Sequence, residues 1–198
     1  MLKNFIIATL ALVGFVNAGI SVGSCPTPTL QENFVAPTYM GLWYEAARDG
    51  GMPWESNDCQ QARYHINPDG TVGVLNSQYD PKLDQVTNAT AVATFNGAQG
   101  KVKFFPYAPA GDYRVLYTDY NNFAVVYSCD TFLLAKTEYI WILTRSEEAY
   151  EEDVMKALQI LKDKVPLYDQ TQIRMTKQGK FKIPINCKYL PNTVQAQE

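Results

Sequence analysis

The sequence predicts an all-β fold, a barrel or a sandwich, that ends in one α-helix. Between Gly41 and Arg145, short segments rich in Val, Tyr, Phe and Thr alternate with turn residues at intervals of roughly 8–12 residues, a spacing typical of barrels and sandwiches. After Arg145 the apolar residues recur at helical spacing instead. The length of 198 residues suits one domain with a single core.

The N-terminus has the pattern of a secretory signal peptide. Lys3 precedes an apolar run over Phe5–Val16, and small residues follow up to Ala18. A membrane anchor is the alternative, but a bilayer requires about 20 apolar residues and this run is shorter. We therefore expect a signal peptide over residues 1–18, a secreted, extracellular domain over 19–190 and a disordered tail over 191–198.

The charge pattern argues against a nucleic-acid partner. The net charge is −3, and the sequence has no basic stripe that could follow a phosphate backbone. It also has no basic cluster beside an apolar segment, so electrostatic binding to a membrane is not expected.

Eight strands are expected between Gly41 and Arg145. The turn Asn67-Pro68-Asp69-Gly70 is a strong hairpin signal between the second and third of them. The expected strands are 42–48, 61–66, 72–79, 86–95, 101–106, 113–117, 123–128 and 138–144.

The helix is expected to start with Ser146 as its cap, with Glu147 and Glu148 in the first turn, where acidic groups favour the helix dipole. Pro166 ends it. One face is apolar, which predicts packing on the outside of the sheet. That face consists of Val154, Ala157, Leu158, Leu161 and Val165. The following segment, 172–187, is expected to add a short edge strand.

The four cysteines predict two disulfides, because an even number in a secreted chain is typical of a disulfide framework. They are Cys25, Cys59, Cys129 and Cys187, and three pairings are open. No C-x-x-C motif supports zinc binding, and no metal is expected. The sequon Asn88-Ala89-Thr90 is a candidate glycosylation site at Asn88.

Three motifs resemble the conserved regions of the lipocalin family: Gly41-Leu42-Trp43, Thr118-Asp119-Tyr120 and Arg145 at the end of the last strand. Further segments resemble the group of apolipoprotein D and the insect bilin-binding lipocalins. Among them are Cys25-Pro26 and Tyr127-Ser128-Cys129.

The resemblance implies an eight-stranded antiparallel up-and-down barrel with the helix outside. It implies that Trp43 closes one end of the barrel and that Arg145 lies across it. The residues with this structural role are Gly41, Trp43, Thr118, Asp119, Tyr120 and Arg145. The implied disulfides are Cys25–Cys129 and Cys59–Cys187.

The resemblance also implies a cavity for a small hydrophobic ligand: a fatty acid, sterol, retinoid, carotenoid or bilin. Strand alternation from Trp43 predicts that Glu45 and Ala47 point inward. The candidate ligand residues are Tyr64, Val74, Asn76, Phe104, Tyr113, Trp141 and Leu143. The alternative is that these side chains simply fill the core. No cofactor is expected, and a bound lipid or bilin-type pigment is the one alternative.

The open end is expected to be formed by loops 50–57, 80–85 and 106–112. Met52, Pro53, Trp54, Tyr107 and Pro109 are expected to be exposed there. Weak contact with a membrane or lipoprotein is one interpretation, and ordinary packing of the rim is the other. The protein is expected to be a monomer or a weak homo-oligomer.

Catalysis is not expected. All four cysteines match disulfide positions, so no thiol is left as a nucleophile. His65, the one histidine, neighbours inward Tyr64 and should point outward. Two functions are alternatives to the binding and transport of a small hydrophobic ligand. The protein could be a subunit of a protein or pigment complex, or a lipocalin with lipid-antioxidant activity.

Overall fold

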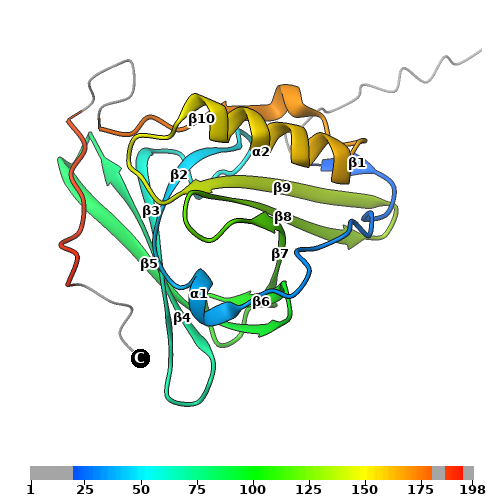
Figure 1. Cartoon of the computed structure of the whole chain (residues 1–198), viewed down its shortest axis with the longest axis horizontal. Coiled ribbons are helices and arrows are strands. Elements are labelled where there is room, and N and C mark those ends of the chain that lie inside the picture. The colour runs from blue at the N-terminus through cyan, green and yellow to red at the C-terminus, as the bar shows by residue number, and fades with distance from the viewer. Residues whose placement is uncertain (1–19, 180–185, 194–198) are drawn as a thin grey trace, which may run out of the picture.

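The computed structural model describes residues 20–179 and 186–193, and the predicted signal peptide lies outside them. Eight of its strands form a closed ring in which each strand pairs antiparallel with its neighbour in sequence (Figure 1). They are β2 (Gly41–Asp49), β3 (Asp58–Ile66), β4 (Val72–Asp80), β5 (Gln85–Asn96), β6 (Gln99–Lys103), β7 (Gly111–Thr118), β8 (Phe123–Phe132) and β9 (Ala135–Thr144).

The ring closes where β9 pairs with β2, with Tyr44 opposite Thr144 and Arg48 opposite Trp141. This pairing confirms the predicted up-and-down barrel. Two short strands extend the sheet. β1 (Ile20–Val22) pairs with β9, and β10 (Ile173–Met175) pairs with β2. β10 is the edge strand expected within 172–187.

A β-bulge in β2 changes which residues face inward. The register shifts between Glu45 and Ala47, so Ala47 lies opposite Ile142 and packs in the cluster outside the barrel. The prediction that Ala47 points inward is therefore wrong, because a bulge inserts one residue and reverses the alternation beyond it. Arg48 takes the inward position, opposite Trp141.

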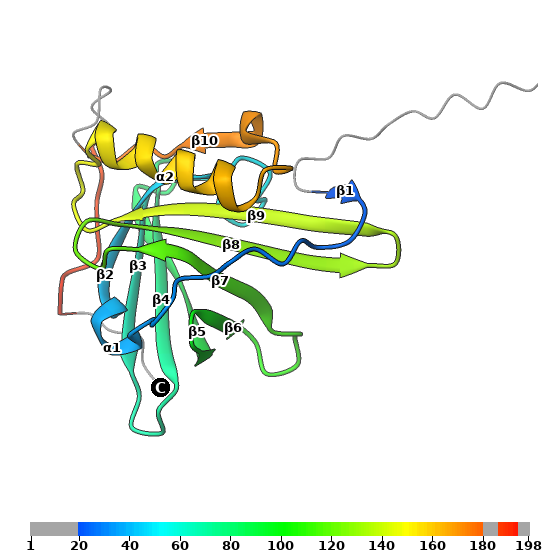
Figure 2. The same cartoon turned by 45° about the vertical axis from the view of Figure 1, so that its right-hand side comes forward.

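α2 (Glu151–Lys164) covers the outer face of the barrel and runs lengthwise along the long β8–β9 hairpin (Figure 2). Val154, Ala157 and Leu161 are buried against Ile140 and Ile142 in one apolar cluster. This confirms the predicted apolar face.

The helix starts later than predicted, because Ser146 accepts a hydrogen bond from the Glu148 amide at 3.2 Å within a turn. The first helical turn carries Glu151, Glu152 and Asp153 instead. No helix among the described residues is long and apolar enough to cross a membrane.

Two disulfides tie both ends of the chain to the barrel, Cys25–Cys129 and Cys59–Cys187. This is the pairing that the resemblance implies. They join residues 104 and 128 positions apart. In the chain-entropy model each loop of that length contributes about 4–5 kcal/mol.

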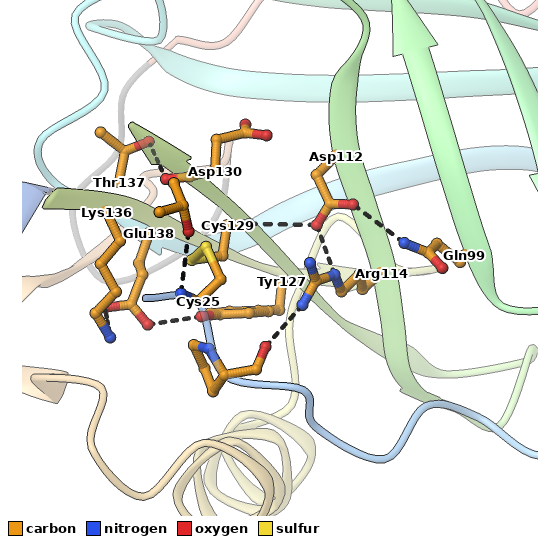
Figure 3. Close-up of a disulfide and its surroundings, with 12 residues drawn as sticks. Cys25, Gln99, Asp112, Arg114, Tyr127, Cys129, Asp130, Lys136, Thr137 and Glu138 are labelled. Atoms are coloured by element: carbon orange, nitrogen blue, oxygen red, sulfur yellow. Dashed lines mark hydrogen bonds and ion pairs between the residues drawn. A yellow bond between two sulfur atoms is a disulfide. The ribbon is translucent and has the colours of Figure 1, made fainter. Parts of the chain in front are cut away.

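The Cys25–Cys129 bridge lies beside a buried ion pair on β7 (Figure 3). The Asp112 carboxylate accepts a hydrogen bond from the Cys129 amide at 3.3 Å and lies 2.6 Å from Nε of Arg114. Arg114 also donates to the carbonyl of Pro26 at 2.9 Å. The disulfide and these polar contacts together hold the N-terminal segment on the outer wall.

The C-terminal segment is held in a similar way. Arg63 on β3 donates to the carbonyls of Leu190, at 2.6 Å, and Pro191. Residues 191–193 are the described part of the predicted disordered tail.

The closed end is built around Trp43, which is fully buried. The guanidinium carbon of Arg145 lies 3.6 Å from the centre of the Trp43 ring, a cation–π contact. Arg145 donates to five backbone carbonyls, whose oxygens lie 2.8–3.3 Å away. They belong to Thr38, Tyr39, Met40, Leu42 and Tyr120. One side chain thus joins β9, β2, the β7–β8 turn and the short helix α1 (Ala36–Tyr39).

The neighbouring turn is held by Thr118 and Asp119. The Thr118 hydroxyl donates to the Phe123 carbonyl at 3.1 Å. The Asp119 carboxylate accepts hydrogen bonds from the amides of Asn121, Asn122 and Phe123. These side chains therefore fix the position of the Tyr120 carbonyl that Arg145 uses.

Replacing Arg145 by Lys should lower the free energy of unfolding by about 2–4 kcal/mol, because one ammonium cannot serve five carbonyls and lie flat on the indole. Urea unfolding would measure this. Lys156→Ala, in an exposed pair with Glu152, is the control and should change little. Equal effects of the two substitutions would contradict the role of Arg145.

Candidate functional site

The interior of the barrel brings together most of the predicted ligand residues. Directly opposed residues of antiparallel strands share a face, so the pairs Ala62–Asn76 and Tyr64–Val74 lie on the same inner surface as Trp43. Six of the seven predicted ligand residues face this interior. They are Tyr64, Val74, Asn76, Tyr113, Trp141 and Leu143. Phe104 follows the end of β6 and is 41% exposed.

The inner lining is apolar but does not pack into one cluster. One buried cluster surrounds Trp43 and Val126, and another contains Val74 and Ala91. Tyr64, Asn76 and Trp141 face inward and yet stay partly accessible. The wall of β3 to β5 also carries small inward side chains, such as Ala62 beside Asn76 and Ala93 beside Val72. An apolar lining with a few accessible aromatic and polar groups is typical of sites that bind small molecules.

Three tyrosines form a hydroxyl cluster in the interior. Tyr39 comes from α1, Tyr64 from β3 and Tyr113 from β7. The Tyr113 hydroxyl lies 2.9 Å from that of Tyr39 and 3.2 Å from that of Tyr64. Burial raises the pKa of Tyr64 to about 12 and raises the pKa values of the other two well above their usual range. All three hydroxyls therefore stay protonated at neutral pH.

A second polar group lies between β2 and loop 50–57. Arg48 donates to the Glu45 carboxylate, to the Thr176 hydroxyl at 3.1 Å and to the carbonyls of Glu55 and Asn57. Thr176 in turn donates to Glu45. Glu45 and Arg48 are almost completely buried.

Glu55 reaches into the barrel from loop 50–57. Its carboxylate accepts a hydrogen bond from Nε1 of Trp141 at 2.9 Å. Burial, the charge of Glu45 and a hydrogen bond with that residue raise the pKa of Glu55 to about 8, although the bond from Trp141 and the charge of Arg48 oppose this. Glu55 and Arg48 are site residues that the sequence reasoning missed. The bulge that turns Arg48 inward and the fold of the loop leave no periodic signal in the sequence.

Loop 50–57 also differs from the expected exposed rim. Met52 is only 3% exposed. Trp54 is 55% exposed, but its ring contacts that of Tyr139 with the ring centres 5.2 Å apart. The expectation that Met52 is exposed is therefore wrong, because the loop folds back onto the barrel mouth. Tyr107 and Phe105, in the β6–β7 loop, are fully and 68% exposed.

Other polar features do not contribute to the interior. His65 lies on the opposite face of β3 from Tyr64, with its ring against Gly73, where a Cβ atom would clash with it. A depression of about 290 Å³ lies outside the barrel, near Arg145 and Tyr150. Among the described residues no group of three or more His, Cys, Asp or Glu side chains could hold a metal.

Residues 35–178 match the family described as the lipocalin-like domain. The chain is 34% identical over 184 residues to apolipoprotein D of Oryctolagus cuniculus, covering 86% of this chain and 97% of that protein. It is 34% identical over 169 residues to the Lazarillo protein of Schistocerca americana, covering 77% and 78%. The structure of insecticyanin from the tobacco hornworm Manduca sexta has a similar fold, with a TM-score of 0.71 at 20% identity over 82% of this chain and 90% of that one.

The buried Glu55 carboxyl should make stability depend on pH. Its pKa rises from the ordinary 4.5 to about 8 on folding, so the folded chain holds a proton that the unfolded chain has lost. Stability from this group is therefore present below about pH 4.5 and is lost as the pH rises to about 8.

Urea unfolding between pH 5 and pH 9 would test this. Glu55→Gln should lose less stability over this range than the natural chain. Asp69→Asn is the control, because hydrogen bonds from Thr71 lower the pKa of that exposed carboxyl and move its titration out of the range. If Glu55→Gln and the natural chain lose stability equally, Glu55 does not titrate in this window.

Proposed function

Since the chain belongs to the lipocalin family, whose members bind small hydrophobic ligands, we propose that it binds such a ligand in the barrel and carries it outside the cell. The inner surface supports the proposal most directly, because inward-facing Tyr64, Asn76 and Trp141 remain accessible. An apolar, partly aromatic lining with few polar groups is typical of sites that bind small molecules by burial.

The proposed ligand residues are those of the inner walls. Val74 and Leu143 provide apolar contact, Trp141 and Tyr113 provide aromatic contact, and Asn76 provides a polar atom. Phe104 belongs to the rim and would contact a ligand only as it enters.

Secretion is part of the proposal. It is supported by the signal-peptide pattern of residues 1–18 and by the two disulfides, which form in oxidising compartments. Asn88 is exposed on β5, as a glycosylated side chain must be.

A side chain that narrows the mouth should block ligand uptake. Ala89 lies on the inner face of β5, opposite Asn76, and is exposed, so Ala89→Phe should fold normally. We expect it to weaken the binding of retinol, followed by retinol fluorescence, by at least about tenfold, because the ring occupies the entrance. Val92→Phe, on the outer face of the same strand, is the matched control. Equal affinities of the two variants would place the ligand elsewhere.

We also propose weak contact of the open end with lipid surfaces. The β2–β3, β4–β5, β6–β7 and β8–β9 connections lie at one end of an up-and-down barrel, and each carries an exposed large apolar side chain. These are Trp54, Leu83, Phe105, Tyr107, Leu133 and Leu134. Apolar groups gathered at one end are typical of an interaction surface.

Liposome flotation would test this contact. The double variant Phe105→Ser and Leu134→Ser should reduce binding to neutral phosphatidylcholine vesicles several-fold, because it removes two apolar groups that would enter the lipid. Met155→Ser and Leu167→Ser, exposed on and beyond α2, form the matched control. Unchanged flotation of the first variant would leave ordinary rim packing as the explanation.

A further inference from the structure

The hydroxyl cluster of Tyr39, Tyr64 and Tyr113 has one hydrogen-bond donor more than it uses. Three hydroxyls bring three protons, and the two contacts among them consume two, whichever way each bond runs. Within the described part of the chain these hydroxyls make no other hydrogen bond. One O–H group in the barrel therefore remains available to an acceptor atom of a ligand.

The wall of β4 offers the opposite kind of group. The buried Oδ1 atom of Asn76 has no hydrogen-bond partner among the described residues. Asn76 faces inward, opposite Ala62 and Ala89, whose methyl groups cannot provide one. A buried acceptor without a partner costs free energy, so a ligand that brings a donor to it would be favoured.

Neither arginine that borders the interior can receive an anion. The two terminal nitrogens of Arg48 carry four N–H groups, which donate to Glu45, Thr176 and the carbonyls of Glu55 and Asn57. Arg145 is bound to backbone carbonyls behind the Trp43 ring.

The carboxyl groups of Glu45 and Glu55 add to this preference. They come from β2 and loop 50–57, and Glu55 meets Trp141 on the opposite wall. Both also act electrostatically on Tyr64, so the two groups border the same interior. A ligand carboxylate placed there would lose its hydration and meet the charge of Glu45, and the described residues offer it no free cation.

We propose that the barrel selects uncharged lipophilic alcohols and carbonyl compounds over lipophilic carboxylates. The ligand oxygen accepts a hydrogen bond from the tyrosine cluster, and an alcohol can in addition donate to Asn76. This inference rests on the proposed function and specifies the chemical class of its ligand.

Matched ligands test the selection directly. Retinol and retinoate share one hydrocarbon skeleton, as do hexadecanol and hexadecanoate, and each pair differs only in its polar end. At pH 7.4 the full mature chain should bind each alcohol at least about tenfold more tightly than its carboxylate. Glu55 ionises with a pKa of about 8, so this ratio should widen between pH 7.4 and pH 9 in the natural chain and stay constant in Glu55→Gln, whose amide oxygen can still accept from Trp141.

The tyrosine cluster is tested separately. The double variant Tyr64→Phe and Tyr113→Phe should weaken retinol binding about five- to tenfold, because it removes the two partly accessible hydroxyls and leaves only that of Tyr39, which is completely buried. It should not change the binding of anhydroretinol, which has the same polyene but no oxygen. A substitution that merely loosened the barrel would weaken both.

The possible failures are distinguishable. If the carboxylates bind as tightly as the alcohols, or if the double tyrosine variant affects retinol and anhydroretinol equally, the proposed selection is overturned and ligand binding stands. If no compound of either pair binds, the proposed function itself is overturned together with the selection.

Discussion

The pairing of β9 with β2 is the constraint on which the rest of the structure depends. Without it the eight strands would form an open sheet with two unpaired edges. With it every strand of the ring has two neighbours, and the inward residues of all the strands face one enclosed space. Arg145, the residue after β9, reinforces the same closure by binding the carbonyls of Leu42 and Met40 at the start of β2.

The bulge within this pairing decides how charge is distributed across the barrel wall. It sends Ala47 outward to pack beneath α2 and turns Arg48 inward beside Trp141. Burying an arginine and a carboxylate destabilises the folded state, because both groups lose their hydration. The structure offsets this cost with a full set of hydrogen bonds, including those to the carbonyls of loop 50–57. The same bonds hold that loop, and with it Glu55, at the mouth of the barrel.

The interior therefore combines an apolar lining with polar groups that still have an unused hydrogen-bond donor or acceptor. The tyrosine cluster has a donor to spare and Asn76 has an acceptor to spare, whereas Arg48 has no terminal N–H group left. This combination suits the binding of a small hydrophobic ligand, since apolar burial provides affinity and a few unpaired polar atoms provide selectivity. The disulfides stay outside this space and fix the chain ends to the outer wall, so they stabilise the barrel without occupying it.

The sequence by itself determined the strand order, the helix after β9 and, through the Trp43 and Arg145 motifs, the choice of a barrel. The family resemblance placed Tyr64 and Asn76 on the inner face, and strand alternation put Trp141 and Leu143 on one face of β9. Only the tertiary structure decided the inward turn of Arg48, the burial of Met52 and the approach of Glu55 to Trp141. These depend on a bulge and on a loop packing against strands distant in sequence, and neither leaves a periodic signal. The helix start also escaped prediction, because Ser146 uses its hydroxyl in a turn that the sequence cannot distinguish from a cap.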